Sequence, residues 1–152
     1  MDTPAARRSP WHQVGNLRCS KLSGIAIPNS VSALGVGAFW QCQGMTNVSI
    51  PEGIARIENY TFEYCDNLTS VTIPAGVTYL GESAFANCSK LKSVIFEGNA
   101  PMVGIHAFRH VAPDFKIAYH TGATGFTFPI WTDCLGAKWP SQELPAIETI
   151  KK

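Results

Sequence analysis

Apolar residues recur along the chain with a 23-residue period, and this repeat is clearest between positions 27 and 96. Each repeat opens with an Ile-Pro pair, at Ile27, Ile50 and Ile73. Further columns of one residue class follow each pair at constant spacing: Val31, Ile54 and Val77; Leu34, Ile57 and Leu80; Phe39, Phe62 and Phe85; Cys42, Cys65 and Cys88; Met45, Leu68 and Leu91; Val48, Val71 and Val94. The pattern is typical of a repeat protein.

The period predicts one short β-strand in each coil. Segments 45–50, 68–73 and 91–96 carry apolar residues at their first, fourth and sixth positions, and polar Ser49 and Thr72 alternate with the last two. The proline that follows the first two segments cannot donate to a ladder and ends the strand. We expect each strand to pair in parallel with the next, and the rest of each coil to return across the opposite side. One coil cannot bury its own apolar face, so the core forms only in the stack.

The array begins and ends with incomplete coils. Cys19, Leu22 and Ile25 occupy columns of the repeat, so a half coil precedes residue 28. Residues 1–16 have no period and predict a flexible arm or a degenerate cap, in which Trp11 is a candidate cover for the open end of the stack.

A fourth coil keeps the spacing through Val103, Phe108 and Ile117. Asp114 stands in an apolar column, and we expect Phe115 to fill the gap. The strand 115–120 is expected to end the sheet. Residues 121–140 abandon the period and predict a C-terminal cap with turns at its glycines, and residues 141–152 predict a flexible tail.

Two stretches of the repeat, SIPEGIARIENYTFEYCDNLTSV and TIPAGVTYLGESAFANCSKLKSV, resemble the BspA-type leucine-rich repeats over residues 17–120. The resemblance implies a right-handed solenoid with a parallel β-sheet on one side. It also implies a surface or secreted protein of a bacterium or protist, of a kind linked to adhesion and binding. It supplies no catalytic residues.

Composition limits the classes of partner. The formal net charge is +1, and 15% of the residues are charged, so neither a nucleic-acid partner nor membrane insertion is expected. No apolar run in residues 1–15 forms a signal peptide, which keeps a cytosolic location open beside the extracellular or cell-surface one. We expect a monomer.

Five cysteines are present, and four of them recur at the spacing of the repeat: Cys19, Cys42, Cys65 and Cys88. The favoured interpretation is one buried thiol per coil, because buried thiols behave as small apolar groups. Disulfides between neighbouring coils remain an alternative, since the strand spacing of about 4.8 Å permits them. The odd count leaves Cys134 as a candidate free thiol.

The sequence offers little for catalysis, metals or cofactors. It contains no nucleophile elbow, phosphate loop, dinucleotide fingerprint or H-E-x-x-H motif. His106 and His110 stand four residues apart, and His120 is the nearest third imidazole, but loop histidines explain them better than a metal site. We therefore expect no enzymatic activity, no metal and no cofactor.

Two surfaces are candidates for binding. The first, which we call the strand face, consists of the outward residues of the predicted strands: Asn47, Ser49, Ser70, Thr72, Ser93, Ile95 and Lys116. Stacking would set them in rows about 4.8 Å apart, as suits an extended protein or a repetitive glycan. The second is the aromatic pair Trp40 and Tyr64 at non-core positions. The leading hypothesis is a protein- or glycan-binding adhesion module; the alternative is a structural spacer without a ligand.

Overall fold

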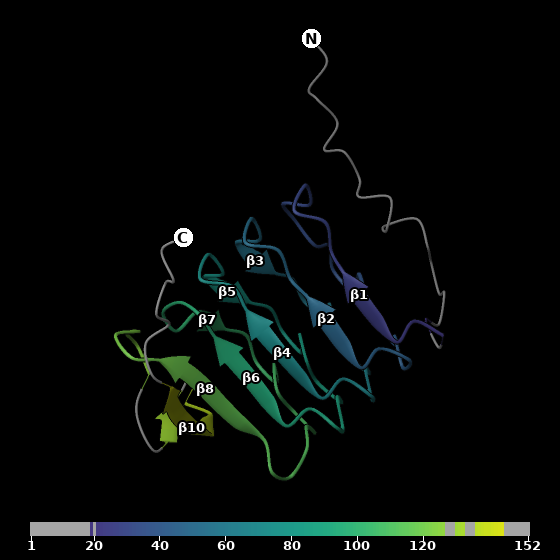
Figure 1. Ribbon diagram of the computed structural model, residues 1–152. Helices are drawn as coiled ribbons and strands as arrows, with labels where there is room; N and C mark the ends of the chain where they lie inside the picture. The colour runs from purple at the N-terminus through teal and green to yellow at the C-terminus, as the bar shows by residue number, and fades with distance from the viewer. Residues whose placement is uncertain (1–18, 20, 127–129, 133–135, 145–152) are drawn as a thin grey trace.

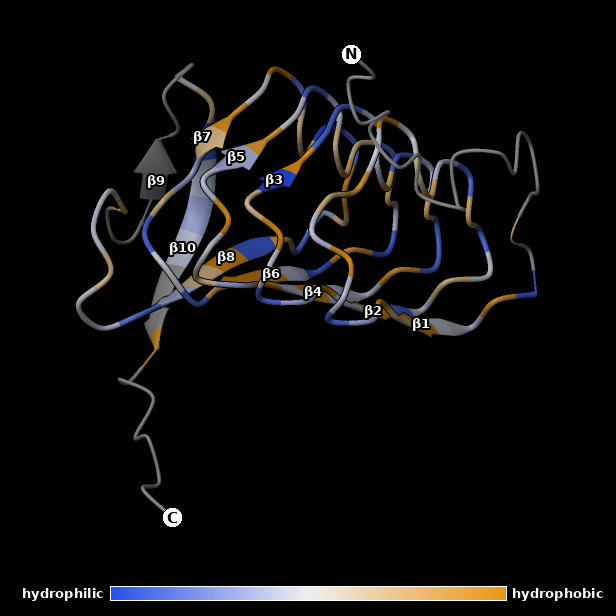
Figure 2. Ribbon diagram, turned by 90° about the horizontal axis from the view of Figure 1, so that it is seen from above, coloured by the Kyte–Doolittle hydropathy of each residue, from blue (hydrophilic) through white to orange (hydrophobic). Residues whose placement is uncertain are grey.

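The chain forms a β-solenoid whose coils follow one another along a single axis (Figure 1). The computed structural model describes residues 19, 21–126, 130–132 and 136–144, with the strands named below. Parallel strands line one side of the stack, and a second row of short strands lies on the opposite side (Figure 2). The fold is the repeat solenoid that the 23-residue period predicts.

The longer strands build two sheets on one side of the solenoid. β1 (Gly24–Ala26) pairs in parallel with β2 (Asn47–Ser49). The second sheet has the order β4-β6-β8-β10-β9. Its strands are β4 (Ser70–Ile73), β6 (Ser93–Phe96), β8 (Lys116–His120), β9 (Ile130–Thr132) and β10 (Lys138–Leu144). The predicted strands of segments 45–50, 68–73, 91–96 and 115–120 are thus confirmed.

A smaller sheet lies across the core from the first two. It consists of β3 (Arg56–Ile57), β5 (Tyr79–Leu80) and β7 (Met102–Val103), which pair in parallel. Leu34 extends the row by an isolated parallel bridge to Ile57. The sequence indicated a returning segment here, but two-residue strands are too short to show an alternating pattern.

The register of the sheets follows the sequence period. Val71 lies opposite Val94, and Val94 lies opposite Ile117. One period of the sequence is therefore one rung of the ladder, and equivalent side chains lie over one another.

Stacked apolar columns form the core. The rings of Phe39, Phe62, Phe85 and Phe108 lie nearly parallel, at successive centroid distances of 5.3, 5.1 and 5.8 Å. The thiols of Cys42, Cys65 and Cys88 and the side chains of Met45, Leu68 and Leu91 are buried beside them. The predicted inward orientation of the Phe column is confirmed.

Two expectations for the amino-terminal coils are wrong. β2 and β4 lie next to each other but belong to separate sheets, so the parallel pairing is interrupted between them. β2 stops at Ser49, one position earlier in its coil than β4 does at Ile73. Leu22 occupies a core column, yet 44% of its surface is exposed, whereas Leu68 in the same column is fully buried.

The carboxyl-terminal end also differs from the prediction. β8 does not end the sheet, because Ser141–Leu144 of β10 pairs in parallel with it. The predicted flexible tail therefore begins too early: four of its residues form part of a strand, and residues 145–152 lie outside the described residues. The signal was missed because residues 121–144 leave the repeat, so no column indicates a partner.

Aromatic rings close the core at this end. Trp139 meets Phe108 and Phe115 edge-on, with centroid distances of 5.4 and 5.8 Å, and Phe126 stacks on Tyr119 at 4.6 Å. Phe115 is buried and fills the gap beside exposed Asp114, as expected. Gly122, Gly125 and Gly136 adopt positive φ values, which agrees with the predicted turns. Trp11 and Cys134 lie outside the described residues.

Candidate functional site

The structure assembles the strand face from consecutive rungs. Ser70 lies opposite Ser93, which lies opposite Lys116, and Thr72 lies opposite Ile95. Asn47 and Ser49 project from β2, beside this block. Asn47, Ser49, Ser70, Thr72 and Lys116 are exposed, while Ser93 and Ile95 are half-buried. The face is most accessible over β2 and β4.

Hydroxyl groups of the strand face make no side-chain hydrogen bond within the described part of the chain. This holds for the following residues: Ser49, Ser70, Thr72 and Ser93. The preceding loops behave differently, because Asn67 Nδ2 donates to the Gln43 carbonyl and Lys90 Nζ donates to Asn67 Oδ1. Loop side chains tie the coils together, whereas the strand-face hydroxyls remain available to solvent.

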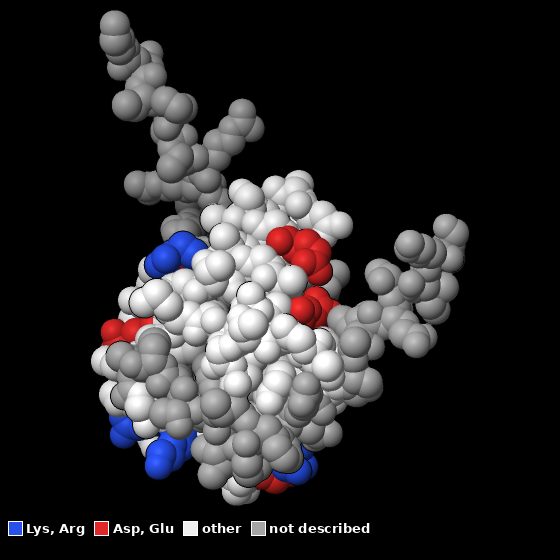
Figure 3. All heavy atoms as spheres, turned by 90° about the vertical axis from the view of Figure 1, so that its left-hand side faces the viewer, with Lys and Arg blue, Asp and Glu red and all other residues white. Residues whose placement is uncertain are grey.

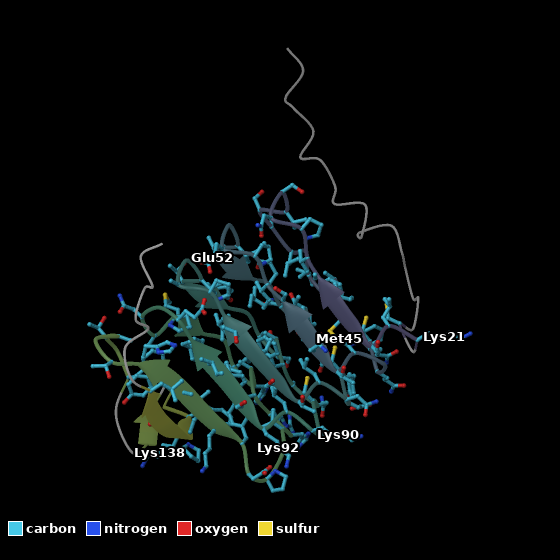
Figure 4. The ribbon with its side chains drawn as sticks, viewed as in Figure 1. Lys21, Met45, Glu52, Lys90, Lys92 and Lys138 are labelled. Carbon is cyan, nitrogen blue, oxygen red and sulfur yellow. The ribbon has the colours of Figure 1, made fainter. Side chains whose placement is uncertain are left out.

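Charged residues flank this face at both ends of the strands. Glu52 lies near the carboxyl ends, and Lys90 and Lys92 lie near the amino ends (Figure 4). Lys92 forms an exposed ion pair with Asp114 at 3.1 Å, and the hydrogen bond that Lys92 donates, together with its charge, holds the pKa of that carboxyl below the usual value. A shallow hollow of about 290 Å³ lies at the carboxyl ends, with Ser49, Thr72, Glu52 and Glu97 in its wall. The strand face is therefore bounded by groups of both signs.

The aromatic candidates Trp40 and Tyr64 lie in different columns of the returning segments. Both are about 40% exposed. A hollow of about 370 Å³ contains Trp40 in its wall, together with Val36, Gly37, Tyr60 and Glu63. Tyr64 is not among its lining residues. The structure thus brings Trp40 together with Tyr60 and Glu63, two residues that the sequence analysis did not select.

A recurring backbone conformation defines the segments that carry these residues. Two columns adopt left-handed φ values of 52 to 63° in all four coils. They hold Gly37, Tyr60, Ser83 and His106, and four positions later Gln41, Tyr64, Asn87 and His110. Non-glycine residues seldom adopt this conformation. Because it recurs in every coil, its strain belongs to the coil rather than to a particular site.

Hydrogen bonds between coils hold this conformation. Phe39 N donates to the Thr61 carbonyl at 2.8 Å, and Phe62 N donates to the Ala84 carbonyl at 2.9 Å. Backbone hydrogen bonds from one coil to the next also form at the left-handed positions, where Tyr60 N donates to the Glu82 carbonyl. The side chains at these positions therefore have fixed directions.

A chain of side-chain hydrogen bonds runs along the surface of all four coils. Trp40 Nε1 donates to Glu63 Oε2 at 3.2 Å, and Asn87 Nδ2 donates to Glu63 Oε1 at 3.4 Å. Asn87 Oδ1 in turn lies 2.9 Å from His110 Nδ1. Each step joins residues 23 or 24 positions apart. The Glu63 carboxylate is thereby held beside the Trp40 indole.

Cys42, Cys65 and Cys88 form a ladder of buried free thiols, as the favoured interpretation predicted, whereas Cys19 is only half-buried. Cys65 Sγ lies 3.3 Å from the Phe39 carbonyl, and Cys88 Sγ lies 3.1 Å from the Phe62 carbonyl. Burial raises the pKa of Cys42 and of Cys88 to about 12, and it raises that of Cys65 as well. These thiols are protonated and inert near neutral pH.

Other classes of site find little support in the part of the chain that the structure describes. No group of three His, Cys, Asp or Glu side chains there could hold a metal ion, and His106 and His110 are both exposed. The described residues include no helix long and apolar enough to cross a bilayer. Figure 3 shows acidic and basic side chains in small separate groups on the carboxyl-terminal face.

The stacked 23-residue coils, with a parallel sheet on one side, define a leucine-rich-repeat solenoid. The family model described as "BspA type Leucine rich repeat region" matches residues 17–119 in six copies. The chain therefore belongs to the BspA-type leucine-rich repeat family. No curated protein sequence matches it significantly.

One solved structure agrees with this assignment. The fold is similar to that of a leucine-rich repeat protein of T. pallidum, with a TM-score of 0.61 and 25% identity over 66% of this chain. Weaker matches include a leucine-rich repeat protein from Bacteroides ovatus, with a TM-score of 0.35, 20% identity and 72% coverage of this chain. Another is a leucine-rich cell surface protein from Faecalibacterium prausnitzii, with a TM-score of 0.36, 22% identity and 69% coverage of this chain. The chain spans 47%, 48% and 44% of these three proteins, about half of each.

Proposed function

We propose that this protein is a non-catalytic binding module that recognises an extended protein or glycan through its strand face. Membership of a repeat family that is linked to interaction supports a binding or structural module. The location proposed with it is the cell surface or the extracellular space, in an adhesion protein.

One observation carries this proposal: the hydroxyl groups of Ser49, Ser70 and Thr72 are exposed, and neither they nor the half-buried Ser93 make a side-chain hydrogen bond within the described part of the chain. Those of Ser70, Thr72 and Ser93 are held in register by the ladders of β4, β6 and β8. Rows of fixed donors and acceptors at the strand spacing can bind a ligand that repeats along its own length. Little entropy is lost, because the backbone beneath is already ordered.

Three substitutions on the strand face test this proposal against the structural spacer. Ser70→Glu, Thr72→Lys and Ser93→Glu together place large charged groups on the rows. A matched variant introduces the same charges on an exposed column of the opposite side: Ser32→Glu, Ala55→Lys and Thr78→Glu. Both variants and the unmodified chain are screened on glycan and peptide arrays, and their folding is checked by circular dichroism.

The expected result is a ligand that binds the unmodified chain and the matched variant but not the strand-face variant. If the unmodified chain binds nothing on the arrays, the spacer hypothesis is favoured. If a ligand is found and both variants bind it equally well, the strand face is not the binding surface.

A further inference from the structure

The hollow beside Trp40 combines apolar surface with one carboxylate. Val36 and Trp40 come from the first full coil, and Tyr60 and Glu63 come from the next one. Val36 is 61% exposed and Trp40 is 40% exposed, so the two side chains together present apolar surface to solvent. The hollow has a volume of about 370 Å³ and is open to solvent.

The Glu63 carboxylate of this hollow is held in place by hydrogen bonds and takes part in no ion pair among the described residues. Trp40 and Asn87 donate to its two oxygens. The ion pairs of the described residues are Arg56 with Glu58 and Lys92 with Asp114, and neither includes Glu63. None of the residues that line the hollow is basic.

A second carboxylate, that of Glu82, interacts with one lining residue of the hollow although it does not line the hollow itself. Glu82 lies in the third coil and hydrogen-bonds the Tyr60 side chain, which raises the pKa of that phenol. The phenol of Tyr60 is therefore a neutral donor at physiological pH, and its ring presents an electron-rich face. Aromatic faces attract cations, and tryptophan does so most strongly.

These features discriminate among positively charged ligands. A lysine ammonium has three N–H donors that need acceptors. The Glu63 carboxylate has about four acceptor positions, and two of them already accept hydrogen bonds from Trp40 and Asn87, so about two remain for three donors. A quaternary ammonium group has no donor and requires only apolar contact and negative charge. We propose that the hollow formed by Trp40, Tyr60 and Glu63 binds the trimethylammonium group of a choline-type ligand. This site is separate from the strand face and does not depend on the proposed function.

Nuclear magnetic resonance titration of the full chain tests this inference directly. The signal is the indole N–H resonance of Trp40, assigned with the variant Trp40→Phe. The probes are choline, its neutral isostere 3,3-dimethylbutan-1-ol, phosphocholine and methyl glucoside. Choline is expected to shift the indole resonance saturably and to bind about tenfold more tightly than the neutral isostere. Phosphocholine shows whether the phosphate of a lipid headgroup is tolerated or excluded.

Two matched variants distinguish a specific effect of the Glu63 carboxylate from the effect of removing any negative charge from the chain. Glu63→Gln should weaken choline binding about tenfold, whereas Asp114→Asn, at an exposed position outside this hollow, should leave it unchanged. Equal affinities for choline and its isostere would mean that the hollow is merely apolar and would overturn the inference. A shift with methyl glucoside alone would reassign the hollow to sugars, and the absence of any shift would exclude ligand binding there.

Discussion

The rings of Phe62 and Phe85 lie face to face, 5.1 Å apart and inclined by only 9°, although they belong to different coils of the chain. Phe62 also stacks on Phe39 at 5.3 Å, so it is covered on both faces. Its side chain is fully buried. The packing of the solenoid is therefore concentrated on one central aromatic column.

Removing the Phe62 ring should reduce stability strongly. Phe62→Ala leaves a cavity between two rings and is expected to lower the free energy of unfolding by about 3–5 kcal/mol. Tyr64→Ala, at an exposed position in the same coil, is the control. Urea denaturation measures both variants, and a loss below about 1 kcal/mol for Phe62→Ala would contradict the stacking described above.

Leu22 and Leu68 occupy the same position in the repeat but differ in burial, so truncating each of them compares an exposed leucine with a buried one. Leu68→Ala is expected to cost about 2–5 kcal/mol, because its side chain is fully enclosed. Leu22→Ala should cost less than about 1 kcal/mol, since Leu22 is 44% exposed. Thermal unfolding of both variants measures the difference. Equal losses would show that the amino-terminal half coil is as well packed as the centre.

Close approach between coils excludes a side chain at Gly81. An added Cβ there would lie 2.4 Å from Asn59 N, whereas at Gly53 the nearest atom is the Val31 carbonyl oxygen at 3.9 Å. Gly81→Ala is therefore expected to destabilise by about 1–3 kcal/mol, because the two coils must separate. Gly53→Ala should change stability by less than about 0.5 kcal/mol. If chemical denaturation ranks them in the reverse order, the coils do not approach each other at Gly81.

Buried thiols should make stability depend on alkaline pH. The pKa of Cys88 rises from an unfolded value of about 8.5 to about 12 on folding. As pH increases, the unfolded chain loses its thiol protons first, so this contribution to stability is complete below about pH 8.5 and is lost progressively between about pH 8.5 and 12. Each such thiol contributes a slope of up to about 1.4 kcal/mol per pH unit.

Urea denaturation under reducing conditions, at about pH 8 and about pH 10.5, measures this loss. Cys88→Ala is the reference, because comparison with it cancels the titration of lysines and tyrosines. The variant should lose less stability with pH than the unmodified chain. If the variant and the unmodified chain lose the same amount of stability between the two pH values, the Cys88 thiolate is tolerated in the folded state.

The sequence predicted the features that recur with its period. The Phe column, the thiol ladder and the strands β2, β4, β6 and β8 each follow from equivalent residues at a constant spacing. The family resemblance was also correct. Two kinds of feature were missed. The strand β10 lies outside the repeat. The left-handed conformation recurs in every coil, but its two positions hold Gln, Tyr, Asn, Ser and His as well as one glycine, so no constant residue type indicates it.

The candidate sites could be predicted only in part from the sequence. Trp40 and Glu63 occupy the same column, so their contact could have been found from their positions in the repeat. Tyr64 was selected for its exposure, but it lies one column away from that contact, and Tyr60 is the aromatic residue that lines the hollow. In a solenoid, two surface residues are neighbours when they occupy the same position in successive coils, whatever their residue types.

The separation of β2 from β4 has a consequence for motion within the molecule. β1 and β2 share hydrogen bonds with each other, and the register of the larger sheet begins only at β4. The first two strands can therefore open without breaking the larger sheet. Their amide protons should exchange with deuterium before those of β4 and β6, so that the domain loosens from its amino-terminal coils while the remaining rungs stay intact.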